Sequence, residues 1–132
     1  MYKTNQIKRP EQLKLLYLNL IDNHLQDLIH NRATEMYEIK DFAGLMCIHP
    51  NHLSNTIKDL TGHSPCGLYQ FKILEAAQNL LFDSSRSIRE VAIILTFEPS
   101  QFSKWFKGQY GFTPSQYRLQ LKEGGQSKIL KS

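Results

Sequence analysis

The chain of 132 residues is long enough for one domain, or for two small subdomains that share a core. Hydrophobic residues make up 41% of it, which is ordinary for a folded globular protein and excludes an intrinsically disordered one. The longest apolar stretch is only a few residues, so the sequence predicts neither a transmembrane helix nor a signal peptide. We therefore expect a cytoplasmic protein with no membrane partner.

The formal net charge of +4 is spread unevenly along the chain. Residues 37–118 carry eight Lys and Arg against seven Asp and Glu, so most of the excess lies towards the two ends. Net charge alone therefore does not indicate nucleic acid, and only the placement of individual side chains can do so. Cys47 and Cys66 occur in a chain without an export signal, so we expect both to be reduced.

The first predicted element is an amphipathic helix that follows an N-terminal arm, residues 1–14. Its apolar residues recur at helical spacing from Leu13 to Ile29. We expect this helix to cover the unit that follows it, with His24 and His30 indicating only packing or solvent exposure. Part of it could instead form a dimer surface, giving a weak dimer in place of a monomer. That alternative rests on early apolar residues that lie nearly all round the helix: Leu15, Leu16, Leu18 and Leu20.

Two short helices are predicted next. The first ends near Met46, and a turn, Cys47–His49, leads to a second helix that starts at Pro50. Proline suits the first turn of a helix, where its missing N–H costs nothing, and Gly62 suits the left-handed residue that ends one. Two helices joined by a short turn, the second polar on its outer face, are typical of a helix-turn-helix. The first such subdomain is predicted at residues 15–64.

A long linking helix is predicted at residues 65–82. Its apolar residues keep helical spacing over about five turns. They are Leu68, Phe71, Leu74, Ala77, Leu80 and Leu81. A helix of about 17 residues is about 25 Å long, so it would hold the flanking units at a fixed distance.

A second helix pair, predicted at residues 83–120, has the clearer signals. Ser87–Glu90 has the spacing of a capping box, in which a hydroxyl and a carboxylate satisfy each other's backbone N–H. Pro99 opens the second helix of the pair and Gly111 ends it. Thr113–Gln116 forms another predicted capping box, with proline at the first helical position.

The two helix pairs are related by an offset of 49 residues, which aligns Gly62 with Gly111 and Ser64 with Thr113. Apolar positions align with apolar positions over the same range, so one supersecondary unit is used twice. The predicted fold class is all-α, with about seven helices. Two helix-turn-helix subdomains, each a homeodomain-like three-helix unit, are joined by the long linking helix.

The residues of these units resemble a known family. Ile48–Pro65 resembles the first half of an AraC/XylS-type DNA-binding domain, and Ser87–Ala92 and Phe102–Lys107 resemble the second half. Tyr110–Arg118 resembles the signature ending of that family. The resemblance covers roughly residues 15–120. It implies a transcription regulator, most often an activator that touches RNA polymerase, that binds double-stranded DNA at a bipartite site.

Three features depart from the family pattern. Cys47 and Thr96 occupy turn positions where the family usually has glycine. If those positions are left-handed, a residue with a Cβ costs about 1–2 kcal/mol there. The turn of the second motif is one residue shorter than is typical, so the second recognition helix could start differently. The linking helix offers only Lys72 where the family often has more arginine, so we expect modest DNA affinity.

The resemblance implies that recognition helices at about 50–60 and 99–109 enter the major groove. Outward residues near the start of such a helix reach base edges, and Asn, Gln and Lys can each pair with a purine. The base-reading candidates are Asn51, His52, Ser54, Asn55, Ser100, Gln101 and Lys104. The phosphate candidates are Lys58, Lys107 and Arg118. Trp105 is expected to pack against the linking helix, and for each Asn a solvated polar face remains the alternative.

No constellation in the sequence indicates an enzyme, a cofactor or a metal. A glycine-rich phosphate loop, a nucleophile elbow and a carboxylate pair are all missing. One string of residues superficially resembles zinc ligands. It consists of Cys47, His49, His52, His63 and Cys66, and turn and helix positions already account for these residues.

A competing interpretation is a helical interaction module that has the same fold but no longer binds DNA, which the weak central charge favours. The last segment, residues 121–132, is expected to be a disordered basic tail that contains Lys122, Lys128 and Lys131. The sequence leaves open whether the protein acts alone or forms the C-terminal part of a longer regulator.

Overall fold

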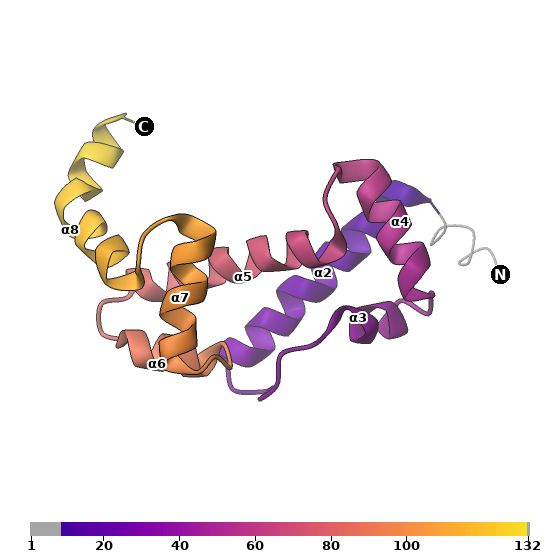
Figure 1. Cartoon of the computed structure of the whole chain (residues 1–132), viewed down its shortest axis with the longest axis horizontal. Helices are drawn as coiled ribbons and strands as arrows, with labels where there is room; N and C mark the ends of the chain where they lie inside the picture. Colours follow the sequence, from indigo (N-terminus) through magenta and orange to yellow (C-terminus); the bar gives the residue numbers. More distant parts are fainter. Residues whose placement is uncertain (1–8, 132) are drawn as a thin grey trace. The chain divides into compact units, whose positions relative to one another are not determined.

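The computed structural model describes residues 9–131, with side chains described up to Glu123. This part contains seven α-helices and no strand (Figure 1). They are α2 (Pro10–Ile29), α3 (Ile39–Leu45), α4 (Pro50–Thr61), α5 (Pro65–Phe82), α6 (Ile88–Ile94), α7 (Pro99–Tyr110) and α8 (Pro114–Lys131). The predicted all-α class with two helix pairs is confirmed. Among the described helices, none combines the length and apolarity needed to cross a membrane.

Helix ends follow the local signals of the sequence. Both recognition helices begin at a proline and end at a glycine in the left-handed conformation, with φ of 77° at Gly62 and 98° at Gly111. A Cβ is strained at such φ values, which explains glycine at these two ends. The predicted capping boxes also form: Ser87 N donates to Glu90 over 2.7 Å, and Thr113 N donates to Gln116 over 2.8 Å.

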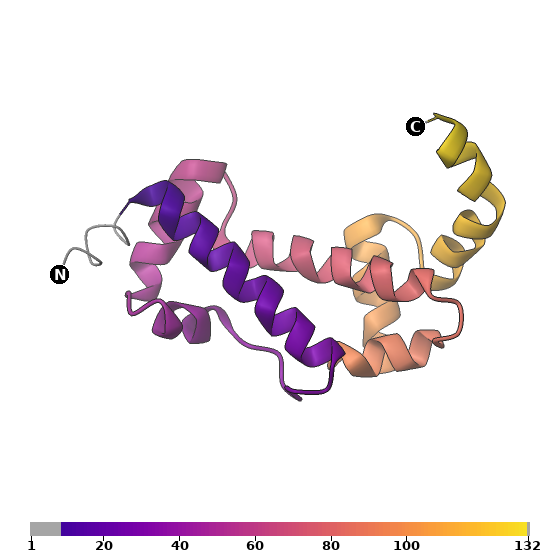
Figure 2. The same cartoon turned by 180° about the vertical axis from the view of Figure 1, so that it is seen from behind.

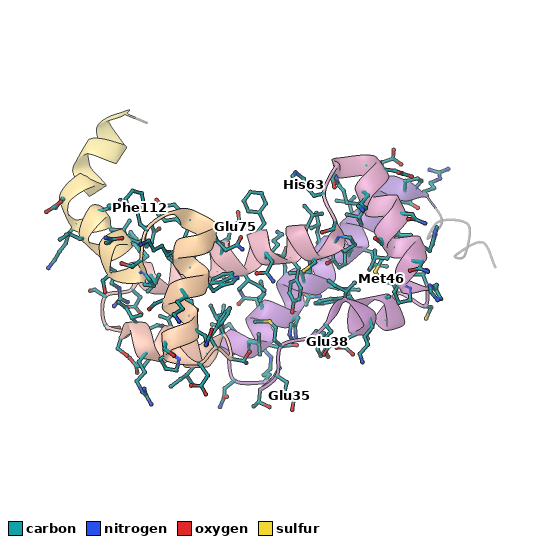
Figure 3. All side chains as sticks on the ribbon, in the orientation of Figure 1. Glu35, Glu38, Met46, His63, Glu75 and Phe112 are labelled. Carbon is teal, nitrogen blue, oxygen red and sulfur yellow. The ribbon has the colours of Figure 1, made fainter. Side chains whose placement is uncertain are left out.

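The chain forms two compact units, and the first lies within Met1–Ile73. In this unit α2 packs against both α3 and α4, as the two opposite views show (Figures 1 and 2). The recognition-helix candidate α4 is therefore held from behind by two helices. The core residues of the unit are Leu13, Tyr17, Ile21, Leu25, Leu28, Phe42, Ala43, Met46, Leu53, Ile57, Tyr69 and Ile73. Met46, at the end of α3, is labelled among the side chains in Figure 3.

Two tyrosine hydroxyls tie the first half of α5 into this unit. Tyr17 donates to the carbonyl oxygen of Pro65 over 2.6 Å, and Tyr69 donates to that of Tyr37 over 2.9 Å. Burial raises the pKa of both hydroxyls, so each remains a proton donor at physiological pH. Lys72, the lone cation of the linking helix, forms an ion pair with Asp22 over 3.1 Å.

His24 belongs to the core of the first unit. The residue is 3% exposed; its ring stacks on Tyr37 at 3.9 Å between centroids and accepts the Tyr37 N–H at Nε2 over 2.9 Å. Burial lowers its pKa, although Asp27 and Asp41 act in the opposite direction. An Nε2 that accepts a hydrogen bond belongs to a neutral ring. The sequence did not reveal this role, because helical spacing alone does not identify the neighbours of a side chain.

The second unit lies within Leu74–Ser132 and has an aromatic core. Phe102 and Phe106 are fully buried, and Phe106 contacts both Tyr110 and Tyr117 at 5.7 Å between ring centroids. The buried residues of the unit are Leu74, Ala76, Ala77, Leu80, Leu81, Val91, Ala92, Leu95, Phe102, Phe106 and Tyr117. Here α7 packs against both α6 and α8.

Several expectations about the elements need correction. Residues 10–14 were predicted as part of an arm, 1–14, but they form the start of α2, which begins at Pro10; residues 1–8 lie outside the described part. The segment at residues 121–132 was expected to be disordered, whereas α8 continues as helix to Lys131. Phe71 was placed on the apolar stripe of the linking helix but is 62% exposed. In its place Tyr69 and Ile73 are buried.

Candidate nucleic-acid interface

The outer face of α4 carries most of the base-reading candidates of the first unit. Leu53 and Ile57 are fully buried, and this fixes the rotation of the helix about its axis. The opposite face is exposed and carries Asn51, His52, Asn55, Lys58 and Asp59. Ser54 is half-buried at the edge of that face. Asn51 and Asn55 lie one helical turn apart and point the same way.

The outer face of α7 repeats this arrangement in the second unit. Phe102 and Phe106 are buried at the positions equivalent to those of α4. The exposed side chains opposite them are Ser100, Gln101, Lys104 and Lys107. Because α7 begins at Pro99 as α4 begins at Pro50, the shorter turn does not shift the start of the second recognition helix relative to the first.

The turn between the helices of each pair is left-handed at the position where the sequence has an unusual residue. Cys47 has φ 59° and Thr96 has φ 66°. In both turns the residue that follows donates its N–H back to an alanine carbonyl: Ile48 to Ala43 over 3.1 Å, and Phe97 to Ala92 over 2.8 Å. This hydrogen-bond pattern ends a helix and requires a left-handed residue, so the predicted strain is present in both turns.

The N-termini of the two recognition helices differ. In α4, the His49 ring accepts the Asn51 N–H at Nδ1 over 3.0 Å and so caps the helix. In α7, Glu98 occupies the equivalent position, and its side chain makes no cap bond. The backbone N–H groups in the first turn of α4 are therefore better satisfied than those of α7.

Two exposed cations that were not among the predicted contact residues are Lys40 and Arg89. Each is the second residue of the first helix of its pair, and the 49-residue offset relates one to the other. In helix-turn-helix proteins this first helix crosses the phosphate backbone. The repeat itself was the signal that could have identified them. Lys40 also lies 3.7 Å from Glu38 in an exposed ion pair, which is weak in water.

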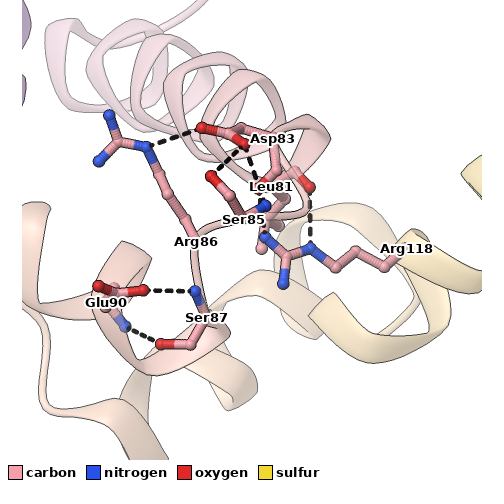
Figure 4. Close-up of polar contacts among 7 residues, drawn as sticks. All are labelled: Leu81, Asp83, Ser85, Arg86, Ser87, Glu90 and Arg118. Atoms are coloured by element: carbon pink, nitrogen blue, oxygen red, sulfur yellow. Dashed lines mark hydrogen bonds and ion pairs between the residues drawn. The ribbon is translucent and has the colours of Figure 1, made fainter.

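Arg118 does not lie on either recognition helix. It extends from α8, where Nε donates to the carbonyl oxygen of Leu81 over 2.8 Å and Nη2 donates to that of Asp83 over 3.0 Å (Figure 4). A guanidinium used in this way closes the C-terminal end of α5. The expected phosphate contact by Arg118 therefore has a structural alternative.

The remaining candidates have local explanations. Trp105 is half-buried, with its ring 4.8 Å from that of Phe97 and 6.1 Å from that of Phe102 between centroids. Within the described residues, no three His, Cys, Asp or Glu side chains come together as metal ligands. Cys47 and Cys66 are both unpaired and exposed.

Comparison with known proteins agrees with this geometry. The family model described as a helix-turn-helix domain matches residues 42–120. Over 94 residues the chain is 30% identical to histidine kinase P4 from Formosa agariphila; the match covers 70% of the chain but spans 7% of that kinase.

Two solved structures share the fold. One is the DNA-binding domain of AdpA, a global transcriptional factor, in complex with a target DNA. It has a TM-score of 0.66 and 23% identity, with 81% of this chain and 93% of that chain covered. The other is an AraC-type transcriptional regulator from Chromobacterium violaceum, with a TM-score of 0.60, 24% identity, and 73% and 87% coverage. With two equivalent helix-turn-helix units and a family match over more than half of its length, the chain belongs to the AraC-type helix-turn-helix family of DNA-binding domains.

Proposed function

We propose that this domain binds double-stranded DNA at a bipartite site, with α4 and α7 reading two adjacent segments of the major groove. One observation carries the proposal. The two helices start at equivalent prolines, bury equivalent residue pairs and leave equivalent polar side chains exposed. Recognition helices of helix-turn-helix proteins use such a face to contact base edges. The complex of the AdpA domain with its target DNA supports the same use of this fold.

Roles follow from the chemistry of each side chain. Base reading is assigned to Asn51, His52, Ser54, Asn55, Ser100, Gln101 and Lys104. Phosphate contact is assigned to Lys58 and Lys107, with Lys40 and Arg89 added from the starts of α3 and α6. We assign Arg118 a structural role in place of phosphate contact, since two of its N–H groups already bind carbonyl oxygens. Activation through RNA polymerase, action in the cytoplasm, and a monomer or weak dimer through α2 belong to the same proposal.

A selection from a random duplex pool at near-physiological salt tests the proposal directly. Retained sequences are expected to contain two short blocks about 10 bp apart, because each helix would read one major-groove segment on the same face of the duplex. A single sequence block would mean that one of the two helices contacts only phosphates. No enrichment at any salt concentration would contradict DNA reading and favour the interaction module.

Two variants separate base reading from phosphate contact. Asn55→Ala is expected to relax the base preference at one position, with a loss of about 1–3 kcal/mol against the preferred base. Lys107→Ala is expected to weaken all sequences evenly and to lower the slope of log affinity against log salt by about 0.9. Affinities of both variants for preferred and altered sequences, measured over a salt series, distinguish base recognition from phosphate contact. The opposite pattern, with sequence preference altered only by Lys107→Ala, would overturn these roles.

A further inference from the structure

The C-terminal end of α5 has no glycine cap; the Asp83 N–H donates back to the Leu80 carbonyl oxygen over 3.2 Å, and the Asp83 carbonyl oxygen accepts the Arg86 N–H over 3.1 Å. The residues after Phe82 are Asp83, Ser84 and Ser85, none of which is a glycine or has a positive φ. The last turn of α5 also lacks a basic residue. The final carbonyl groups of a helix need partners, and its C-terminal end favours a cation.

Arg118 supplies a cation and two further hydrogen-bond donors from α8. Its two hydrogen bonds reach Leu81 in the last turn of α5 and Asp83 just beyond it, and both atoms that accept are backbone oxygens (Figure 4). The guanidinium is planar and rigid, so two bonds to two fixed carbonyls set the direction of α8 relative to the end of α5. All of these groups lie within the second unit.

The connection from α5 to α6 is also held by polar contacts. The Asp83 carboxylate accepts from the backbone N–H of Ser85 over 3.0 Å and from its hydroxyl over 2.6 Å, and it lies 3.5 Å from Arg86. These hydrogen bonds from Ser85 lower the pKa of Asp83, with Arg86 adding to the effect. The capping box of Ser87 and Glu90 follows immediately. The connection into α6, which precedes α7, and helix α8, which follows α7, are thus both held at the end of α5.

We propose that Arg118 is a positioning residue that determines how strictly the domain discriminates the spacing between its two half-sites. The inference rests on the proposed bipartite DNA binding. Since α7 packs between α6 and α8, it is held in one direction relative to the end of α5 as long as the Arg118 bonds persist. When they are lost, α7 can turn relative to α5 and reach half-sites at spacings that the wild type rejects.

The test measures affinity for duplexes with the selected half-sites at their preferred spacing, and with one or two base pairs added or removed. Arg118→Met keeps the apolar stem and removes the donors, while Arg118→Lys keeps the charge without the two-pronged geometry. Both variants are expected to lose discrimination between spacings by about tenfold, an amount equal to about one charged hydrogen bond. Their salt slope is expected to equal that of the wild type.

A contact between Arg118 and phosphate would give a different result: an unchanged spacing ratio and a salt slope lower by about 0.9 for Arg118→Met, with Arg118→Lys close to the wild type. Either finding would overturn the inference. Asp83→Ala, at an exposed site, serves as a second variant if Arg118→Met does not fold, and it is expected to relax the spacing preference in the same direction. Absence of wild-type binding to any duplex would reject the proposed function itself.

Discussion

At the two buried positions of the recognition helices, the first unit has Leu53 and Ile57, whereas the second has Phe102 and Phe106. Around these positions the second unit builds a chain of ring contacts, while the rings of the first unit gather on Phe42 of α3. The same backbone plan therefore tolerates either aliphatic or aromatic filling. Volume and apolarity fix the register of a helix, and many side-chain combinations satisfy both.

The outer faces differ as well. In α4, Lys58 is followed by the exposed Asp59, so the two charges cancel. In α7, Lys104 and Lys107 have no acidic neighbour on the exposed face, because Gly108 takes the place of Asp59. We infer that the first unit depends more on base contacts made by its two asparagines, and the second more on attraction to phosphates. The two copies of a repeated fold can in this way divide base recognition and phosphate contact between them.

The largest expected effect tests the difference in core composition. Phe102→Ala is expected to cost about 3–5 kcal/mol, and the equivalent Leu53→Ala about 2–5 kcal/mol, since each leaves a cavity in a packed core. We expect Phe102→Ala to cost more, because it also removes ring contacts with Phe97 and Phe106. Urea unfolding followed by circular dichroism gives both free energies. An equal or larger cost for Leu53→Ala would contradict the comparison.

The next effect concerns the left-handed turns. Thr96→Gly and Cys47→Gly are expected to stabilise the protein by up to about 1 kcal/mol, because relief of Cβ strain outweighs the extra entropy of unfolded glycine. The gain should be larger at Thr96, whose branched Cβ is the more crowded at φ 66°. Thermal unfolding midpoints measure both gains. Gly44→Ala, in the last turn of α3 with no atom within 4 Å of an added Cβ, is the control for a glycine that is not left-handed.

A smaller effect sharpens the comparison of the outer faces. Gly108→Asp gives α7 the acidic residue that α4 already has, and it is expected to lower affinity for random duplex about threefold at low salt. Asp59→Asn is expected to raise affinity by a similar factor. The difference between each variant and the wild type should shrink at high salt, because ions screen exposed charges. Salt-independent changes would point to altered folding and not to phosphate repulsion.

The smallest expected effect is on the pH dependence of the free energy of unfolding. All five histidines precede the second unit, and buried His24 has a lowered pKa in the folded state. Below the unfolded pKa of about 6.5, the unfolded chain takes up a proton that the native ring does not, so stability is lost as the pH falls towards the folded pKa. Urea midpoints at several pH values should show this loss, and His24→Leu should reduce it.

Much of the fold was predictable because its signals are local. Proline at a helix start, glycine at a left-handed end and a capping box each act within about four residues. The 49-residue repeat then provided an internal check, since every signal of one copy could be sought in the other. The same repeat aligns Lys40 with Arg89, so it also contains the signal for these two exposed cations.

Other features depend on partners that spacing along one helix cannot identify. Phe71 fits an apolar stripe by spacing, yet what covers a residue depends on which other helices pack there, and it is exposed. The role of Arg118 depends on two carbonyl oxygens more than thirty residues away in the chain. The role of His24 in the core depends on Tyr37, which lies in a segment without helical periodicity. Spacing along one helix contains no information about such partners.

The sequence by itself determined the double helix-turn-helix plan, the ends of α4 and α7, and the residues on the outer faces of these two helices. These follow from short-range hydrogen bonding and from the period of an α-helix. Only the tertiary structure decided that the linking helix is shared between two compact units and that its end is capped by Arg118 from α8. Such choices rest on contacts between distant segments, whose free energy is set by packing and by the need to satisfy buried or terminal backbone groups.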